Sequence, residues 1–458
     1  MSLSIIILAA GQGKRMKSKI QKVLHSLAGK SLLEHVVNTT NQFETTQPPI
    51  IVYGHQGEII RQKLTNLNAT WVEQTKQLGT GHAVLQAMPQ INDSDHVLIL
   101  YGDVPLINFD TLTKLIKKTS KNAIGIITAK LQDPKNLGRI VRDASKQIKY
   151  IVEEKDASPA ELAIKEINSG IYIIPAKYLK RWLPKLSNNN AQKEYYLTDI
   201  IKIASEEKIP IHSEHPEHIE EVFGINDKIQ LAHAERFFQK FNAEKLMRNG
   251  VTFLDPQRID IRGELIAGQD VVIDINVIIE GRVVIGDNCI IGANSILKNV
   301  VLSNNVEIKA NCFIEESHIS ENCLIGPFAR IRPGTILSKN VQIGNFIEIK
   351  NSKIGVASKI HHVGYIGDTK VGDSVNIGAG VITCNYNGYE KNKTIIGNKA
   401  FIGSNSELVA PVTIGEMAVI GAGSTIRRDA PANKLTVSGN KQRTIENRVK
   451  KLNNQEEA

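Results

Sequence analysis

The chain has 458 residues, of which 41% are hydrophobic and 22% are charged, so we expect a globular protein of two or more domains. No apolar run approaches the length that spans a membrane, and the first residues show neither the basic start nor the cleavage site of a signal peptide. The basic residues behind the net charge of +9 are scattered, and no aromatic and basic patch appears before the tail, so small anionic substrates account for the charge as well as nucleic acid would; we expect no nucleic-acid partner.

The first motif is an apolar run at residues 4–8 followed by a glycine-rich, basic segment at residues 9–16. A strand that leads into such a turn is typical of a phosphate-binding loop, in which backbone N–H groups face the anion. The dinucleotide fingerprint does not fit, because Met16 occupies the place of the third glycine. A Walker loop does not fit either, since Leu24 stands where its first glycine should be. A simple turn remains the alternative.

Further apolar runs at residues 50–53, 96–100 and 123–127 alternate with helical stretches. This alternation predicts a mostly parallel sheet with helices on both faces, in which ligands bind beyond the carboxyl ends of the strands. Asp103 follows one of these runs, and its carboxylate is suited to Mg²⁺, which prefers hard oxygen ligands. A turn-forming aspartate would account for Asp103 equally well.

Three further segments complete the first half of the chain. Residues 74–81 offer amide and hydroxyl groups, which we expect on a loop that can read the edge of a base. Residues 138–141 and 149–153 predict a hairpin, and residue 168 opens another strand. Helical spacing between residues 227 and 249 predicts a helix that ends at a glycine and links two domains.

The second half is dominated by an apolar residue at every sixth position. A period of six is typical of a parallel β-helix, in which stacked coils build one continuous core. We expect Gly, Asn or Asp at the corners to adopt the positive φ needed there, and a β-sandwich with coincidental spacing is the alternative. The periodicity ends after Ile426, and we expect residues 441–458 to be a poorly ordered polar tail. The clearest run comprises Ile396, Ile402, Leu408, Ile414, Ile420 and Ile426.

The hexad rhythm breaks strongly once, between Ile377 and Ile396, so residues 384–391 must leave the coil as a loop. All four cysteines lie in this half and form no C-x-x-C motif. Buried, reduced thiols in a cytoplasmic protein are therefore expected.

The motif L-A-A-G-x-G-x-x-M at residues 8–16, followed by Lys22, resembles the signature of sugar-1-phosphate nucleotidylyltransferases. Gln21 departs from it, because the family commonly has proline there. With G-T-G at residues 79–81, Y-G-D at residues 101–103 and the hexapeptide half, the chain to about residue 440 resembles a bacterial bifunctional family. That family combines N-acetylglucosamine-1-phosphate uridyltransferase with glucosamine-1-phosphate acetyltransferase activity.

The resemblance implies an N-terminal Rossmann-like nucleotidyltransferase domain (1–226), a linker helix (227–250) and a left-handed parallel β-helix acetyltransferase domain with a polar tail (251–458). It also implies a cytoplasmic homotrimer with two active sites per chain and no membrane partner. Its substrates would be UTP, acetyl-CoA and glucosamine-1-phosphate, and its metal would be Mg²⁺.

Carried over residue by residue, the resemblance implies a uridylyl site on the N-terminal domain. Lys22 and Arg15 would hold phosphates, and Asp103 and Asn226 would hold Mg²⁺, because two anions must approach each other in this reaction. The implied nucleotide-binding residues are Leu8, Ala9, Ala10, Gly11, Gln74, Gly79, Thr80 and Tyr101. The implied contacts to N-acetylglucosamine are Gly138, Glu153 and Asn168.

On the β-helix, the resemblance implies an acetyl-transfer site with His362 as the general base, since imidazole accepts a proton near neutral pH. We expect the adjacent His361 to face the other way, as successive strand residues do. Gly439 replaces a family arginine at the CoA phosphates, and Lys441 or Arg443 is the expected substitute. The implied sugar-phosphate residues are Arg332, Lys350, Tyr365, Asn376 and Lys391. The implied acetyl-CoA residues are Ala379, Asn385, Tyr386, Ser404 and Ala422.

Two alternatives stay open. The β-helix could be a structural or regulatory module attached to a nucleotidylyltransferase, but a scaffold needs neither His362 nor the loop at residues 384–391. The chain could also be a binding platform without activity, but the presence of Lys22, Asp103 and Asn226 argues against this.

Overall fold

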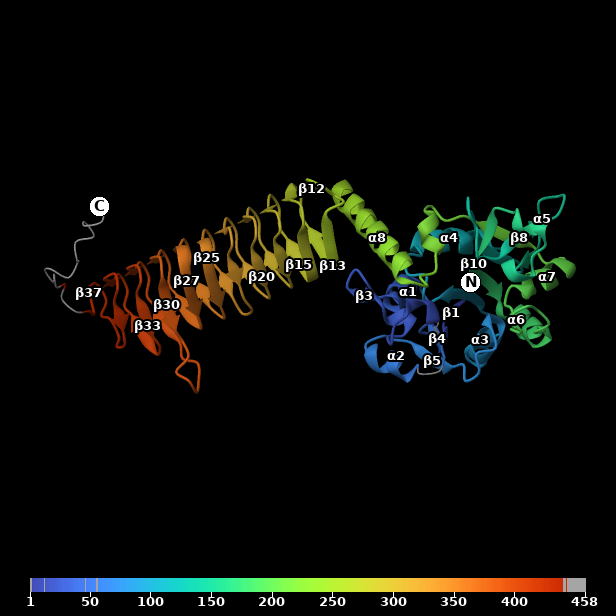
Figure 1. Cartoon of the computed structure of the whole chain (residues 1–458), viewed down its shortest axis with the longest axis horizontal. Helices are drawn as coiled ribbons and strands as arrows, with labels where there is room; N and C mark the ends of the chain where they lie inside the picture. Colours follow the sequence, from blue (N-terminus) through green and yellow to red (C-terminus); the bar gives the residue numbers. More distant parts are fainter. Residues whose placement is uncertain (1, 12, 46, 55–56, 440–441, 443–458) are drawn as a thin grey trace, which may run out of the picture. The chain divides into compact units, whose positions relative to one another are not determined.

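The computed structural model describes residues 2–11, 13–45, 47–54, 57–439 and 442. The chain forms two compact units, Met1–Gln239 and Lys240–Ala458, and the division falls inside helix α8 (Lys228–Arg248) (Figure 1). The predicted boundaries at residues 226 and 250 stay a prediction. Within the described ranges, no helix is both long and apolar enough to cross a membrane.

The first unit is built on a sheet with the strand order β11-β7-β10-β6-β1-β4-β5. Strand β1 pairs in parallel with β4 and β6, and β11 pairs in parallel with β7. Strand β10 is antiparallel to both of its neighbours, so the predicted mostly parallel sheet is confirmed with one reversed strand. The strands of this path are β1 (Leu3–Ala9), β4 (Ile50–Tyr53), β5 (Thr70–Glu73), β6 (His96–Tyr101), β7 (Ile124–Lys130), β10 (Glu166–Pro175) and β11 (Ile211–Glu214).

Two hairpins accompany this sheet. Strands β8 (Arg139–Arg142) and β9 (Ile148–Val152) are antiparallel, which confirms the predicted hairpin. Strands β2 (Ser26–Leu27) and β3 (Lys30–Ser31) form a short second hairpin.

Helices cover both faces of the sheet because alternate residues of β1 point to opposite sides. Ile6 packs with residues of α3, α6 and α7, whereas Ile5 packs with residues of α1, α2 and α4. The α-helices are α1 (Leu32–Thr40), α2 (Glu58–Lys63), α3 (Thr80–Ala87), α4 (Phe109–Lys118), α5 (Pro159–Leu162), α6 (Ala176–Trp182), α7 (Asp199–Glu206) and α8. The 3₁₀ helices are η1 (Lys14–Met16), η2 (Lys22–Leu24), η3 (Met88–Gln90), η4 (Glu154–Asp156), η5 (Leu183–Lys185) and η6 (Ile219–Val222).

The register of the sheet brings the predicted nucleotide loops together. Leu8 pairs with Val52 on one side and Tyr101 on the other, and the N–H of Gly102 donates to the carbonyl of Leu8 at 2.9 Å. Asn168 lies inside β10 next to a bulge and does not open the strand, because the pairing with β7 starts at Glu166.

The second unit is a left-handed parallel β-helix in which each strand pairs with a strand of the next coil, usually 17 or 18 residues further along (Figure 1). Inward aliphatic residues stack in register, and each buried side chain contributes about 1.5–3 kcal/mol. One fully buried column comprises Ile279, Leu297, Ile314, Ile331, Ile349 and Ile366.

The strands of this unit are short, as the hexad period requires. Up to the middle they are β12 (Val251–Phe253), β13 (Ile259–Ala267), β14 (Val271–Ile273), β15 (Val277–Ile285), β16 (Ile290–Ile291), β17 (Ile296–Lys298), β18 (Val301–Leu302), β19 (Glu307–Ile308), β20 (Phe313–Glu315), β21 (His318–Ile319), β22 (Leu324–Ile325), β23 (Arg330–Ile331) and β24 (Ile336–Leu337). The remainder are β25 (Gln342–Lys350), β26 (Lys353–Ile354), β27 (Lys359–Gly367), β28 (Thr369–Val371), β29 (Asn376–Ile377), β30 (Val381–Cys384), β31 (Thr394–Ile396), β32 (Phe401–Ile402), β33 (Glu407–Val409), β34 (Val412–Ile414), β35 (Val419–Ile420), β36 (Thr425–Ile426) and β37 (Leu435–Thr436).

The corners of the β-helix differ from the prediction in which residues adopt a positive φ. Positive φ falls mainly on asparagines such as Asn288 and Asn305, whereas Gly286 and Gly292 have no positive φ. A Cβ at Gly292 would lie 2.6 Å from the backbone nitrogen of Ala310. These hexad glycines are therefore required by the close approach of successive coils and not by corner conformation.

The β-helix also extends beyond its predicted end at Ile426. Ala430 bridges to Ile414, and strand β37 pairs in parallel with β35. The stacking continues because backbone pairing does not need an aliphatic residue at every sixth position. The predicted polar tail at residues 441–458 lies, apart from residue 442, outside the described residues.

Candidate functional sites

The first candidate site begins at the carboxyl ends of β1 and β6. Lys22 opens η2, and its Nζ donates to Oδ2 of Asp103 and, at 3.1 Å, to Oδ1 of Asn226. The Lys22 and Asp103 side chains are only 12% and 14% exposed. Three residues far apart in the sequence therefore form one small polar cluster, which we call the lysine–carboxylate cluster.

This cluster contains oxygen atoms suited to a hard cation. The Asn226 Nδ2 donates to the carbonyl of Gly224 at 3.1 Å, so its Oδ1 is left to accept from Lys22. The two oxygens already converge on a positive charge, the Lys22 ammonium. Carboxylate and amide oxygens, completed by water and phosphate, are the ligands that Mg²⁺ prefers. Among the described residues no group of three or more His, Cys, Asp or Glu side chains forms a metal site, so any ion here would depend on such additional ligands.

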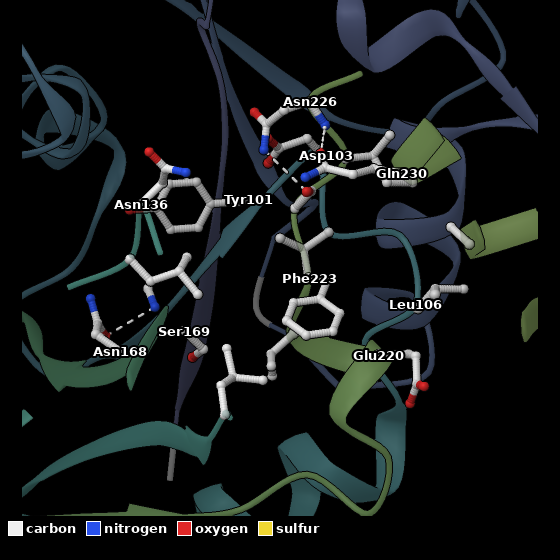
Figure 2. Close-up of a pocket in the computed structure, with 18 of the residues that line it drawn as sticks. Tyr101, Asp103, Leu106, Asn136, Asn168, Ser169, Glu220, Phe223, Asn226 and Gln230 are labelled. Carbon is white, nitrogen blue, oxygen red and sulfur yellow. Dashed lines mark hydrogen bonds between the residues drawn. The ribbon is translucent and has the colours of Figure 1, made fainter. Parts of the chain in front are cut away.

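Beside the cluster lies a cavity of about 640 Å³. Figure 2 shows Asp103 and Asn226 next to each other, with Asn136 and Asn168 on the other side of the cavity. The predicted site residues that line it are Arg15, Tyr101, Asp103, Gly138, Glu153, Asn168 and Asn226. Among the described residues, the lining does not include Leu8, Ala9, Ala10, Gly11, Lys22, Gln74, Gly79 or Thr80.

The predicted sugar-binding residues come together on one wall. The Asn168 N–H donates to the carbonyl of Gly138 at 2.9 Å, and a Cβ at Gly138 would lie 3.5 Å from both carboxylate oxygens of Glu153. Burial raises the pKa of Glu153, although its Oε1 accepts a hydrogen bond of 3.1 Å from Oγ1 of Thr198. The wall therefore combines a backbone edge with a carboxylate, both suited to sugar hydroxyls.

The segment predicted as a base-reading loop is partly helical. Helix α3 starts at Thr80, whose Oγ1 accepts from the N–H of Leu197 at 3.1 Å. The buried Gln74 side chain donates to the carbonyl of Gly79 at 3.1 Å. The predicted loop at residues 74–81 is therefore wrong for residues 80–81, which belong to α3 and are bonded to residues more than 100 positions away.

The cavity also includes residues that sequence reasoning missed. Asn136, Ser169 and Gln230 supply polar groups, and Phe223 supplies an aromatic ring close to the cavity centre (Figure 2). Asn136 follows a Pro134–Lys135 turn that resembles any surface turn, so nothing in the sequence marked it. Phe223 follows the short helix η6, which the sequence pattern did not reveal.

The second unit carries a polar cluster around Asp368, which we call the Asp368 cluster. Asn351 and Asn385 each donate from Nδ2 to one oxygen of the Asp368 carboxylate, and Nζ of Lys350 lies 3.7 Å from Oδ2. The Asn385 Nδ2 also lies 3.4 Å from the Tyr365 hydroxyl. Contact with Lys350 lowers the pKa of Lys391, whereas Asp368 and Tyr365 raise it. Four predicted site residues thus surround one carboxylate, and Asp368 itself was not predicted.

Arg332 is held near this cluster by a second carboxylate. Its Nη1 lies 2.7 Å from Oε1 of Glu348, and Glu348 pairs in register with Tyr365. Glu348 was also missed, because a glutamate at an outward strand position resembles any solvated residue. Asn376 lies in β29, in register with Lys359 and Phe401.

His362 stands at a different corner of the same coil. Its Nδ1 lies 3.2 Å from Oδ1 of Asn345, while His361 Nε2 lies 3.0 Å from Oε1 of Gln342. The two imidazole rings are 6.0 Å apart and inclined by 77°. His361 is half-buried and His362 is exposed, and burial lowers the pKa of His361.

The predicted acetyl-CoA residues continue this corner through later coils. The N–H of Gly380 donates to Val363, that of Asn405 to Ala379, and that of Gly423 to Ser404, at distances between 2.6 and 2.8 Å. The corner therefore carries His362, Ala379, Ser404 and Ala422 in succession. Tyr386 lies on the loop at residues 384–391, where its hydroxyl donates to the carbonyl of Gly388 at 2.6 Å.

The fold and the two clusters define a class of protein, a nucleotidyltransferase unit joined to a β-helix of the kind found in acyltransferases. Residues 5–205 match the MobA-like NTP transferase domain family, and residues 393–428 match the bacterial transferase hexapeptide family with six repeats. Residues 261–362 match the GMPPB C-terminal domain family.

Similar proteins cover nearly the whole chain. The bifunctional protein GlmU of Coxiella burnetii (strain CbuK_Q154) is 54% identical over 446 residues, which are 97% of this chain and 98% of that protein. The bifunctional protein GlmU of Alcanivorax borkumensis is 52% identical over 98% of this chain and 98% of its own length. That of Ralstonia pickettii (strain 12J) is 48% identical over 97% of this chain and 97% of its own length. The chain belongs to the family of bifunctional GlmU proteins. The predicted family, fold class and pair of transferase activities are confirmed.

Proposed function

We propose that this chain catalyses two steps of UDP-N-acetylglucosamine synthesis. The β-helix unit transfers an acetyl group from acetyl-CoA to glucosamine-1-phosphate, and the first unit transfers uridylyl from UTP to the N-acetylated product and releases pyrophosphate. The observation that carries the proposal is the convergence of Lys22, Asp103 and Asn226 beside a cavity of about 640 Å³ lined by Glu153 and Asn168.

In the uridylyl step, the sugar phosphate attacks the α-phosphorus of UTP in line. Both reactants are anions, so the site has to neutralise charge and stabilise the departing pyrophosphate. Arg15 lies exposed at the cavity and Lys22 contacts Asp103, which lines it, and both cations would bind phosphate oxygens. Gly138, Glu153 and Asn168 would orient the sugar, while Leu8–Gly11, Gln74, Gly79, Thr80 and Tyr101 would hold the nucleotide.

Asp103 and Asn226 are the residues that would hold Mg²⁺. Their oxygens both accept from the Lys22 ammonium, and the Asp103 carboxylate supplies the negative charge that would attract the ion. The ion would supply further neutralisation of the phosphates when it is bound. With the ion held there, Lys22 would turn from the carboxylate to the phosphates of the substrate.

In the acetyl step, His362 would take the proton from the amine as it attacks the thioester carbonyl of acetyl-CoA. Asn345 contacts Nδ1 of His362, which leaves Nε2 to face the substrate. Arg332, Lys350 and Lys391 would bind the sugar phosphate together with Tyr365 and Asn376. Ala379, Asn385, Tyr386, Ser404 and Ala422 would bind acetyl-CoA.

We propose further that the protein is a homotrimer whose acetyl-transfer site is completed by a neighbouring chain. Phe328, Phe346 and Val363 occupy successive corners of three coils, and the two phenyl rings stack at 5.3 Å. These apolar residues are each about half exposed, which is costly unless another surface covers them. The loop at residues 384–391 projects from the coils (Figure 1), and its Tyr389 is 96% exposed, so the loop is free to reach another chain.

The reducing cytoplasm is the proposed location. The four cysteines are free thiols, and burial raises the pKa of Cys289, Cys312 and Cys323, to about 11 for Cys323. Lys441 or Arg443 remains the proposed substitute for the family arginine, and both lie outside the described residues.

The test is product analysis on the purified chain. Incubation with glucosamine-1-phosphate, acetyl-CoA, UTP and Mg²⁺ should yield UDP-N-acetylglucosamine, CoA and pyrophosphate in equal amounts. Omission of acetyl-CoA should abolish pyrophosphate release from glucosamine-1-phosphate, and addition of N-acetylglucosamine-1-phosphate should restore it. Pyrophosphate release that does not depend on acetylation would contradict the proposed order of the two steps.

A further inference from the structure

We propose that Asp368 is a positioning residue of the acetyl-transfer site, where its carboxylate orients Asn385 and holds the lysines Lys350 and Lys391 side by side. The inference rests on the proposed acetyltransferase function and names a residue outside the predicted site. Asp368 itself would touch neither substrate, so its effect would pass through the residues around it.

The contacts of Asp368 use both of its oxygens. Asn351 of the preceding coil donates to Oδ1, and Asn385 of the following coil donates to Oδ2. Because an asparagine amide can rotate about its last bond, the carboxylate decides that Nδ2 of Asn385 points inward and Oδ1 points away. The orientation of a predicted acetyl-CoA residue therefore depends on the charge of Asp368.

Asp368 also balances the charge of two lysines. Lys350 and Lys391 are neighbouring cations, and contact with Lys350 lowers the pKa of Lys391. Oδ2 of Asp368 lies 3.7 Å from Nζ of Lys350, and Asp368 and the Tyr365 hydroxyl both raise the pKa of Lys391. Burial alone would raise the pKa of Asp368, but the hydrogen bonds from Asn351 and Asn385 and the two lysine charges together lower it. The carboxylate is thus ionised at neutral pH and keeps two cations available for one phosphate.

A corner role by itself does not explain this residue. The equivalent corners of earlier coils carry Asn299, Glu316 and Asn351, which share its positive φ but are exposed. Asp368 is only 8% exposed, and an asparagine or glycine would satisfy the corner without burying a charge. A buried carboxylate at this point is favourable only with its partners, which are residues of the proposed site.

The experiment compares Asp368→Asn with Asp373→Asn. Asp373 is an exposed corner aspartate whose Oδ1 accepts from the N–H of Val356 at 2.7 Å, so its variant controls for the loss of a corner carboxylate. Steady-state acetyl transfer is measured between pH 6 and 10 at varied acetyl-CoA and glucosamine-1-phosphate, with uridylyl transfer and melting temperature measured on the same samples.

For Asp368→Asn we expect kcat/KM of acetyl transfer to fall by about tenfold or more, as for the loss of a charge-assisted hydrogen bond. The KM for acetyl-CoA should rise because Asn385 loses its anchor. The KM for glucosamine-1-phosphate should start to rise at a lower pH than in the wild type, because Lys391 loses its proton earlier. Uridylyl transfer, and every parameter of Asp373→Asn, should stay within about twofold of the wild type.

Two results would overturn the proposal. One is a folded Asp368→Asn protein with wild-type KM values and an unchanged pH profile. The other is a loss of turnover that follows the melting temperature alone, with the KM values and pH profile unchanged, which would assign Asp368 to folding. Absence of acetyl transfer in the wild type would instead contradict the proposed function, so the two failures are distinguishable.

Discussion

Replacement of Asp103 by asparagine tests the proposed uridylyl site, because it removes a charge and keeps the shape of the side chain. Asp103 and Lys22 are 14% and 12% exposed, and their charge-assisted hydrogen bond contributes about 1.5–3 kcal/mol. An asparagine oxygen can still accept from Lys22 but carries no net charge, and Lys22 also keeps its hydrogen bond of 3.1 Å to Oδ1 of Asn226. We therefore expect the first unit to lose about 2 kcal/mol, or about 4–8 °C of melting temperature for a unit of this size.

The effect on activity should be larger than the effect on stability. An asparagine oxygen carries no net charge, so it binds Mg²⁺ weakly and neutralises no cation. A loss of about 3 kcal/mol of transition-state stabilisation lowers uridylyl transfer by more than a hundredfold. Acetyl transfer should stay within about twofold, because its proposed residues belong to the other compact unit.

The assay measures pyrophosphate release and CoA thiol release on the same preparation, across a series of Mg²⁺ concentrations. Asp110→Asn is the matched control, since Asp110 lies exposed on α4. Higher Mg²⁺ should partly restore the Asp103→Asn enzyme. An equal loss of both activities in a folded protein, or uridylyl transfer near the wild-type rate, would refute this reasoning.

Three further predictions concern the other proposed residues. His362→Ala should lower kcat of acetyl transfer by about 10²–10⁴-fold with little change in either KM. His361→Ala should lower kcat far less. Near-normal turnover of a folded His362→Ala protein would remove His362 from the mechanism. Sedimentation equilibrium should give about three times the chain mass of 50.5 kDa. Phe346→Asp should dissociate the trimer and abolish acetyl transfer while uridylyl transfer remains. A monomer that is active in acetyl transfer would exclude a shared site. Glu153→Gln should raise the melting temperature at pH 7. Burial raises the pKa of Glu153 in the folded state above its usual value of 4.5, so ionisation of this group at neutral pH destabilises the folded protein, and glutamine removes that cost. That gain should vanish below pH 4.5, where both states are protonated, and a gain that persists there would show that charge is not the cause.

The repeat half shows what local pattern can determine. Most hexad strands pair with the next coil only 17 or 18 residues away, so one inward residue, such as Ile349, is enough to specify the place of its strand in the stack. The same reasoning placed strand β1 and the turn after it. It failed at the end of the β-helix, where β37 pairs through its backbone without the hexad residue.

The sites depended on contacts between distant parts of the chain. Lys22 meets residues 81 and 204 positions further on, and only a family resemblance suggested that Asn226 belongs with it. In the sequence, Asp368 resembles any corner residue. It becomes a buried charge only because the following coil brings Asn385 onto its carboxylate. Periodicity records which side chains face inward, because burial repeats with the strand. The contacts between polar groups depend on how distant segments fold onto one another. Such contacts produce no periodic pattern in the sequence.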